Sequence, residues 1–170
     1  LEQLRGKRLL ALRAPSMCLA PAWIDNLVRP HEPGGSTKFF AGLAWESKPS
    51  KVLLPVFFGH ADACLTTSSS FSVMSELNPQ VGKRLRTLAV SPEIIATLYA
   101  FRRGYAGDGR QRLGEALSVL SSHPAGRQVL TMYQIEGLEE KPVSQLRESL
   151  AILEQSERAS GNRAVGGGPR

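Results

Sequence analysis

Short apolar runs alternate with helix-like segments through the first ninety residues of the chain. Leu9–Leu12 is a compact apolar run after a basic lead, and it predicts a buried strand. A helix is predicted from Leu19 to Val28. Further buried strands are predicted from Ala61 to Thr66 and from Leu85 to Val90. The alternation favours an α/β fold whose parallel-core sheet is flanked by helices on both faces.

Serine and proline residues help to locate the elements between these strands. Lys38–Ala41 is expected to form a short strand. Ser47 is expected to cap the next helix, with Pro49 tolerated in its first turn. Pro55 should kink that helix or end its regular bonding, because proline lacks an N–H group.

The segment after the Ala61–Thr66 strand should be helical. Either Ser69 or Ser70 is expected to cap this helix, which continues through Leu77. The pair Asn78-Pro79 is expected to stop it.

Beyond the first ninety residues the pattern becomes mainly helical. Residues 97–101 are expected to form one more strand, and a helix is predicted to start at Pro124. Apolar residues recur at helical spacing and predict core-facing stripes rather than cofactor sites. They are Leu113, Leu117 and Leu120 in one group, and Val143, Leu146, Leu150 and Leu153 in another. The glycine-rich residues 158–170 are expected to be a disordered tail.

The charge balance points to anionic partners. The chain has 170 residues and a net charge of +6, which suits a protein that attracts small anions. The basic residues are scattered and form no long run and no stripe interleaved with aromatic residues, so we expect no nucleic-acid partner.

The cysteines and known motifs exclude several classes of protein. Cys18 and Cys64 are too few for a disulfide framework or a zinc site built on paired Cys motifs, and both are expected to be buried thiols. A single bridge between them stays possible. Dinucleotide-binding, P-loop and zinc-protease motifs are absent from the sequence, and so is a nucleophile elbow. We therefore expect no catalytic residue, no metal and no cofactor.

Two loops could form an anion site. Pro15 and Ser16 follow the first strand, and Thr66, Thr67 and Ser68 follow the strand that contains Asp62. Ligands of open α/β sheets bind beyond the carboxyl ends of the strands. Each loop leads into a helix N-terminus, where free N–H groups favour an anion, and the hydroxyls add donors.

Asp62 is an acid within an otherwise apolar run, so its carboxylate needs a partner. It could bind a ligand ammonium group, or it could pair with an internal N–H or a lysine. His60, Asp62 and the nearby serines suggest a catalytic triad only weakly. The side chains of His60 and Asp62 would point to the same side only if both residues lay in the strand.

Several segments resemble the phosphate, phosphite and phosphonate group of type II periplasmic binding proteins, specifically their second lobe. The resemblance covers roughly residues 1–153. It rests on Leu4–Arg8 before a strand, on Val56–Ala63, on Met74–Gly82 as the most specific match, and on Val90-Ser91-Pro92 as the return crossing.

The resemblance implies a solute-binding component of an ABC-type importer that holds an oxyanion between two lobes. The ligand-binding residues would be Pro15, Ser16, Asp62 and Thr66–Ser68, with Asp62 matching an acid that meets the ligand amine in aminophosphonate binders. The partners would be the oxyanion and a transporter permease, and the location would be periplasmic or extracytoplasmic. Ser16 keeps the family's hydroxyl, whereas Met17 and Cys18 depart from it.

The resemblance also sets an expected division of the chain. Residues 1–92 would form the second-lobe ligand-binding domain, and residues 93–157 the returning strand and C-terminal helices of the first lobe. Because the chain begins at Leu1 without Met or a signal peptide, we expect a mature or trimmed product with the first lobe largely missing. Apolar surface left uncovered would favour self-association. The alternative function is a ligand-sensing or scaffold module that keeps the fold without transport.

Overall fold

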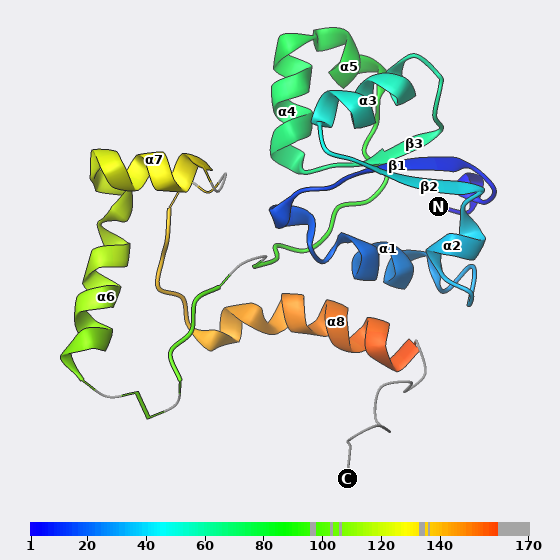
Figure 1. Ribbon diagram of the computed structural model, residues 1–170. Helices are drawn as coiled ribbons and strands as arrows, with labels where there is room; N and C mark the ends of the chain where they lie inside the picture. Colours follow the sequence, from blue (N-terminus) through cyan, green and yellow to red (C-terminus); the bar gives the residue numbers. More distant parts are fainter. Residues whose placement is uncertain (96–97, 103, 106, 133–134, 136, 160–170) are drawn as a thin grey trace. The chain divides into compact units, whose positions relative to one another are not determined.

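The computed structural model describes residues 1–95, 98–102, 104–105, 107–132, 135 and 137–159 (Figure 1). The chain forms two compact units, residues 1–97 with 146–170 and residues 98–145. These units are defined by packing. The predicted division into a second lobe and a returning first-lobe segment at residue 92 stays a prediction.

A three-stranded parallel sheet forms the centre of the first unit. Its strands are β1 (Arg8–Leu12), β2 (Gly42–Glu46) and β3 (Ala63–Leu65), in the order β2-β1-β3. In the register, Leu10 of β1 lies opposite Ala44 of β2 and Cys64 of β3. The predicted α/β class with a parallel-core sheet is confirmed.

Helices connect and flank these strands. The α-helices of the first unit are α1 (Ala20–Val28), α2 (Ser36–Phe39), α3 (Pro49–Phe57), α4 (Ser68–Leu77), α5 (Pro79–Arg84) and α8 (Arg147–Ala159). Short 3-10 turns η1 (Glu2–Leu4) and η2 (Pro15–Met17) flank β1. The second unit contains α6 (Asp108–Ser118), η3 (Leu120–Ser122) and α7 (Pro124–Met132), and η4 (Val143–Leu146) leads into α8.

The sheet is covered on both faces. α1 and α2 lie on one face, and α3 with α4 and α5 lies on the other (Figure 1). On the first face, Leu9 and Phe39 belong to a core cluster with Ile24 and Val28. Phe39 is fully buried, and burying such a side chain stabilises the fold by roughly 1.5–3 kcal/mol. On the other face, Val52 and Leu53 bury the inner side of α3.

Two segments differ from the predicted strands. Lys38–Ala41 is not a strand, because Phe39 and Phe40 place their rings in the core from the end of the short helix α2. The strand instead follows at Gly42–Glu46, where every residue keeps some exposure. The predicted strand at residues 85–90 is also wrong, because no described strand pairs with it. In the segment predicted at 97–101, Thr97 lies outside the described residues, and residues 98–101 form no strand.

The helix ends were predicted less well than the helices. Lys48, not Ser47, occupies the N-cap of α3, although Pro49 does stand in its first turn. Pro55 lies inside α3, and the helix ends two residues later at Phe57. Thr67 caps α4, not Ser69 or Ser70, because its hydroxyl oxygen accepts the Ser70 N–H at 3.1 Å.

The boundary between α4 and α5 lies where the sequence predicts it. The predicted stop at Asn78-Pro79 is confirmed, and Asn78 also begins α5 by accepting the Gln80 N–H at 3.1 Å. Gly82 lets the two helices approach, because a Cβ there would lie 3.1 Å from the Ser75 side chain. The Met74–Gly82 segment is therefore a compact helix–cap–helix corner.

The final helix packs differently from its apolar pattern. Against the predicted core stripe, Val143 is 77% exposed, Leu150 48% and Leu153 39%. The residues of α8 that are buried are Ser149 and Ile152, because α8 packs against α1 through that side. The predicted disordered tail starts at residue 158, but Arg158 and Ala159 are helical residues of α8, and the tail from Ser160 onward lies outside the described residues.

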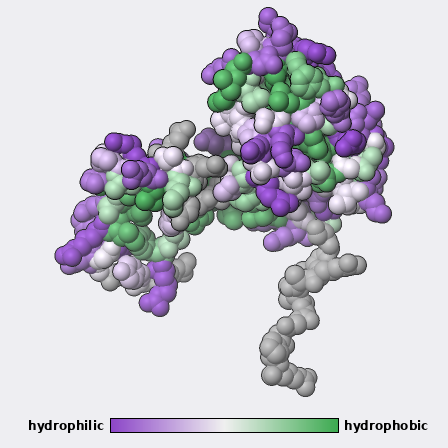
Figure 2. Space-filling view, turned by 45° about the horizontal axis from the view of Figure 1, so that its top comes forward, coloured by the Kyte–Doolittle hydropathy of each residue, from purple (hydrophilic) through white to green (hydrophobic). Residues whose placement is uncertain are grey.

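The second unit has little core of its own. Among its described residues only Gly126 and Leu130, both on α7, are fully buried. Large apolar side chains such as Val119 and Met132 are exposed, and Figure 2 shows hydrophobic surface in green over this part of the molecule.

Gly126 is held by close packing against η3. An added Cβ would lie 1.9 Å from the carbonyl oxygen of Leu120. Gly126→Ala should therefore lower the stability of the second unit, by about 1–3 kcal/mol, because the backbone of η3 must shift. Thermal unfolding followed by circular dichroism measures this change.

Gly114→Ala is the matched control, because nothing lies within 4 Å of a Cβ at that position in α6. Removing a helix-interior glycine there should raise stability by about 0.5–1 kcal/mol. Equal effects of the two substitutions would contradict the packing described for Gly126.

Candidate functional site

The parallel sheet brings two of the predicted loops to one edge. Ala11 of β1 lies opposite Leu65 of β3, so continuing the register by one step sets Leu12 level with Thr66. Adjacent strands lie about 4.8 Å apart. The loops that begin at Arg13 and at Thr66 therefore start side by side at the carboxyl edge of the sheet.

The loop after β1 turns at once into a helix. Pro15 and Ser16 form the 3-10 turn η2, and both side chains are exposed. The Met17 N–H donates to the Ala14 carbonyl oxygen at 2.9 Å, which tightens this turn. Ser16 thus presents its hydroxyl to solvent on a fixed backbone just before α1.

The loop after β3 leads directly into α4. Ser68 is the first helical residue, and its side chain is exposed. The first N–H groups of an α-helix have no acceptor within the helix, so those of Ser68 and Ser69 are open to a ligand. Of the two loops, this helix start is the stronger candidate for an anion site, because exposed hydroxyl and backbone donors stand together.

Thr67 has a structural role at this helix start. Its hydroxyl accepts the Ser70 N–H, donates to Ser70 Oγ at 2.8 Å and lies 3.1 Å from Ser69 Oγ. Thr67 therefore orders the turn and has less hydrogen-bonding capacity left for a ligand than Ser68.

Thr66 carries an unpaired polar atom. Within the part of the chain that the structure describes, its buried hydroxyl oxygen has no hydrogen-bond partner. A buried hydroxyl without a partner costs roughly 1–3 kcal/mol.

Asp62 lies at the opposite edge from these loops. Its carboxylate accepts the Arg8 backbone N–H at 2.8 Å and lies 3.8 Å from Lys7 Nζ, at the amino ends of β1 and β3. The Asp62 carboxylate was expected to be buried, and this expectation is wrong, because the side chain is 40% exposed. The interpretation that holds is the pairing with an internal N–H and a lysine, and Asp62 does not join Thr66–Ser68.

Cationic side chains at the carboxyl edge were missed by the sequence reasoning. Arg13 follows β1 directly, Lys48 precedes α3 at the end of β2, and both are exposed. Glu46 brings a negative charge to the same edge, but Lys51 lies 3.9 Å from its carboxylate. A signal was present in the sequence, since each cation stands one or two residues beyond a strand.

The histidine, serine and aspartate near β3 form no triad. The Asp62 carboxylate is engaged by Arg8 and Lys7 at the amino edge, whereas the serines begin at the carboxyl edge. His60 is exposed, and its ring lies 6.3 Å from that of Phe58.

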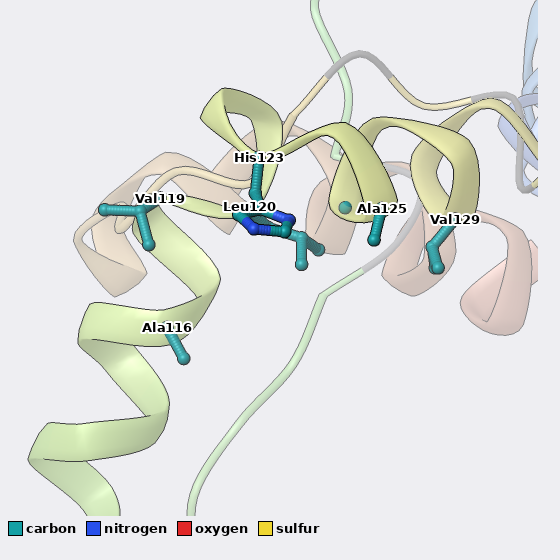
Figure 3. A pocket seen from close by; sticks show the side chains of 7 residues that line it. Ala116, Val119, Leu120, His123, Ala125 and Val129 are labelled. Carbon is teal, nitrogen blue, oxygen red and sulfur yellow. The ribbon is translucent and has the colours of Figure 1, made fainter.

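A separate pocket lies within the second unit. It has a volume of about 370 Å³ and a lining that is apolar except for His123 (Figure 3). Val119 borders it from the C-terminal end of α6, and Val129 borders it from α7. An apolar pocket suits an oxyanion poorly, because a desolvated charge needs hydrogen-bond donors or an opposite charge.

Neither a metal cluster nor a membrane-spanning helix is found among the described residues. No group of three or more His, Cys, Asp or Glu side chains there is placed to hold a metal ion. None of the described helices combines the length and the apolar character needed to cross a membrane.

One comparison with known proteins gives a match. The model of a family described as ABC transporter, phosphonate, periplasmic substrate-binding protein matches residues 1–145. Among curated proteins, none matches the chain. The family match covers the sheet, both loops of the carboxyl edge and the second unit.

The two cysteines should differ in reactivity. No disulfide joins them, and Cys18 is exposed, against the expectation that both are buried. Burial raises the pKa of the Cys64 thiol to about 11, so its reactive thiolate is scarce at neutral pH. Between pH 7 and 10 the Cys64 thiolate fraction should rise about tenfold per pH unit.

Iodoacetamide labelling followed by peptide mass spectrometry measures this difference. At pH 8 Cys18 should be alkylated while Cys64 stays protected, and in denaturant both should react. Equal labelling of the two residues in the folded protein at pH 8 would show that the burial of Cys64 in β3 is wrong.

Proposed function

Since this chain belongs to the phosphonate ABC transporter family of periplasmic substrate-binding proteins, we propose that it binds a phosphate-, phosphite- or phosphonate-like oxyanion. It would deliver this ligand to the permease of an ABC-type importer in the periplasm, without catalysing a reaction. Binding would occur between the lobe that carries the carboxyl edge and a second lobe, and the two would close by hinge bending.

The observation that carries the proposal is the register between β1 and β3. It starts the loops after β1 and β3 at the same edge of the sheet. In the proposal, the Ser16 hydroxyl, the first N–H groups of α4 and the positive end of its helix dipole would contribute to one anion site. These are donors and partial positive charges, which an oxyanion requires.

Within this edge the residues have different roles in the proposal. Ser68 and Ser16 would donate hydroxyl hydrogens to the ligand, and Thr66 would gain the partner that its oxygen lacks. Thr67 would hold the start of α4 in shape, and Arg13 would attract the anion. Asp62 keeps its structural pairing with Arg8 and Lys7 and is not part of the proposed site.

A thermal-shift series tests the function directly. The chain is heated with phosphate, phosphite, methylphosphonate, aminoethylphosphonate or sulfate. A ligand that binds only the folded state raises the melting temperature. At a ligand concentration one hundred times Kd, the free energy of unfolding increases by about 2.7 kcal/mol. We expect a shift with at least one phosphorus oxyanion and a smaller shift with sulfate.

Absence of a shift with every anion, from a sample with a cooperative melt, would contradict binding by this chain. That result would favour a module that keeps the fold for sensing or as a scaffold.

Substitutions at the carboxyl edge test the site itself. Ser68→Ala should weaken the binding of the best anion about tenfold or more, because a hydrogen bond to a charged group contributes roughly 1.5–3 kcal/mol. Thr66→Val should weaken it as well, without loss of stability, because the hydroxyl has no partner in the free protein. Isothermal titration calorimetry measures both affinities.

Two variants serve as matched controls. Thr67→Ser retains the capping hydroxyl and should bind normally, and Asp62→Asn changes a charge at the opposite edge and should also bind normally. A loss of affinity in Asp62→Asn alone, with Ser68→Ala unaffected, would move the site to the amino edge.

A further inference from the structure

Two phenylalanines end α3 at the amino edge of the sheet, opposite the carboxyl edge described above (Figure 1). Phe57 is the last residue of α3, and Phe58 is its C-cap. Gly59 then adopts a left-handed backbone conformation with φ of 78°, which ends the helix sharply. Phe58 is 62% exposed at the tip of this turn. An aromatic ring in this position offers a large apolar surface to a partner.

The side chains of this turn form a connected cluster. The ring centroids of Phe57 and Phe58 lie 5.0 Å apart with an interplanar angle of 72°, which is an edge-to-face contact. The guanidinium carbon of Arg84, at the end of α5, lies 5.0 Å from the Phe57 centroid in a cation–π contact. The apolar tip and a cation are therefore held together before any partner binds, which lowers the cost of ordering them.

Further cations border the aromatic turn. Lys83 lies in the last turn of α5 and is exposed. From β1, Arg8 Nη1 donates to the His60 carbonyl oxygen at 3.4 Å, and the Arg8 side chain is exposed. The Asp62 carboxylate at this edge already faces Lys7, whose Nζ lies 3.8 Å away. The cluster therefore carries an excess of positive charge around an exposed ring.

From this cluster we propose that the Phe58 turn binds the surface of an anionic phospholipid bilayer. The Phe58 ring enters the boundary between headgroups and acyl chains, and Lys83, Arg84 and Arg8 lie against the lipid phosphates. Charge complementarity identifies this partner, because a bilayer of anionic lipids presents negative charge directly above an apolar layer. The turn presents the matching order, with cations around a protruding ring.

The size of the cluster favours a bilayer over a protein partner. A stable protein interface takes about 20–30 residues on each side, whereas a bilayer accepts a single ring and a few point charges without a matching shape. Each cation near an anionic membrane surface changes the partition coefficient about fivefold. Contact at the amino edge leaves the carboxyl edge in water, and the proposal does not rest on oxyanion binding.

Co-sedimentation of the full chain with sucrose-loaded vesicles tests the proposal. The wild type should bind vesicles of equal parts phosphatidylcholine and phosphatidylglycerol, and it should bind vesicles of phosphatidylcholine alone only weakly. Raising the salt from about 0.1 M to about 1 M shortens the Debye length from about 10 Å to about 3 Å and should release most of the bound protein.

Substitutions in the cluster separate its apolar and charged parts. Phe58→Ser should lower the partition coefficient about tenfold, because the ring no longer leaves water. Lys83→Gln with Arg84→Gln should lower it about twentyfold, through the loss of two cations. Circular dichroism and thermal unfolding check that each variant keeps its fold, since Arg84 also contacts Phe57.

Matched controls carry the same chemical changes elsewhere in the first unit. Lys48→Gln with Lys51→Gln removes two exposed cations at the start of α3, the end opposite Phe57. Val73→Ser removes an apolar side chain that is 52% exposed on α4. Both controls should bind the anionic vesicles within about twofold of the wild type. An equal loss in either control would show that overall charge or general surface hydrophobicity drives binding, and would overturn the proposal.

Phe58→Trp reports insertion directly. Its fluorescence should shift to shorter wavelength with phosphatidylglycerol vesicles, beyond any change of Trp23 and Trp45 in the wild type. Soluble glycerol phosphate should release no more protein than sodium chloride of equal ionic strength, and specific release would place binding at an oxyanion site instead. A wild type that fails to sediment with anionic vesicles would overturn the proposal and favour a protein partner. Unchanged binding of Phe58→Ser would also overturn it.

Discussion

The pairing of β1 on both sides is the constraint on which the rest of the first unit depends. β1 is the central strand, and its backbone bonds to β2 on one side and to β3 on the other, both in parallel. Parallel pairing requires a crossover between successive strands, and here each crossover contains helices that cover a face of the sheet. It also sets all three carboxyl ends at one edge.

This edge is the basis of the proposed oxyanion site. A site built from the ends of strands needs no single dominant residue, because its donors come from separate loops and from a helix start. Ser16 follows β1 and Ser68 follows β3, 52 residues further along the chain. That both segments start at one edge is a property of topology, so the strand order matters more for the proposed site than any local motif.

The elements that could be predicted from the sequence are those with a local apolar pattern. β1 and α1 were predicted because an apolar run and a helical apolar pattern are local features. β2 was missed because its residues are all partly exposed, and because Phe39 and Phe40 imitate a strand while serving as core side chains of a short helix. The segment at 85–90 has strand-like composition, but strand formation depends on a partner that sequence alone does not supply.

The candidate site could be predicted in part for the same reason. The loops after β1 and β3 were identified because ligand sites follow strands, whereas Asp62 precedes β3 and so lies at the other edge. Thr67 stays a predicted ligand residue, and its capping role was not predicted, because a cap depends on where the helix begins to within one residue. The exposed leucines of α8 escaped prediction, since an apolar stripe does not reveal which side of a helix the fold will use.

The polar attachment of α8 has a consequence for how the folded protein opens. Because Ser149 and Ile152 are its buried residues, α8 has little apolar area to lose, and its release should have a small heat-capacity change and a low free energy. The hydrogen bond between Asn26 and Ile152 joins residues far apart in the chain. Breaking it releases α8 and leaves the pairing of the strands intact. The amides of α8 should therefore exchange with solvent through a local opening, long before those of β1, and a protease could reach this end while the rest of the first unit stays native.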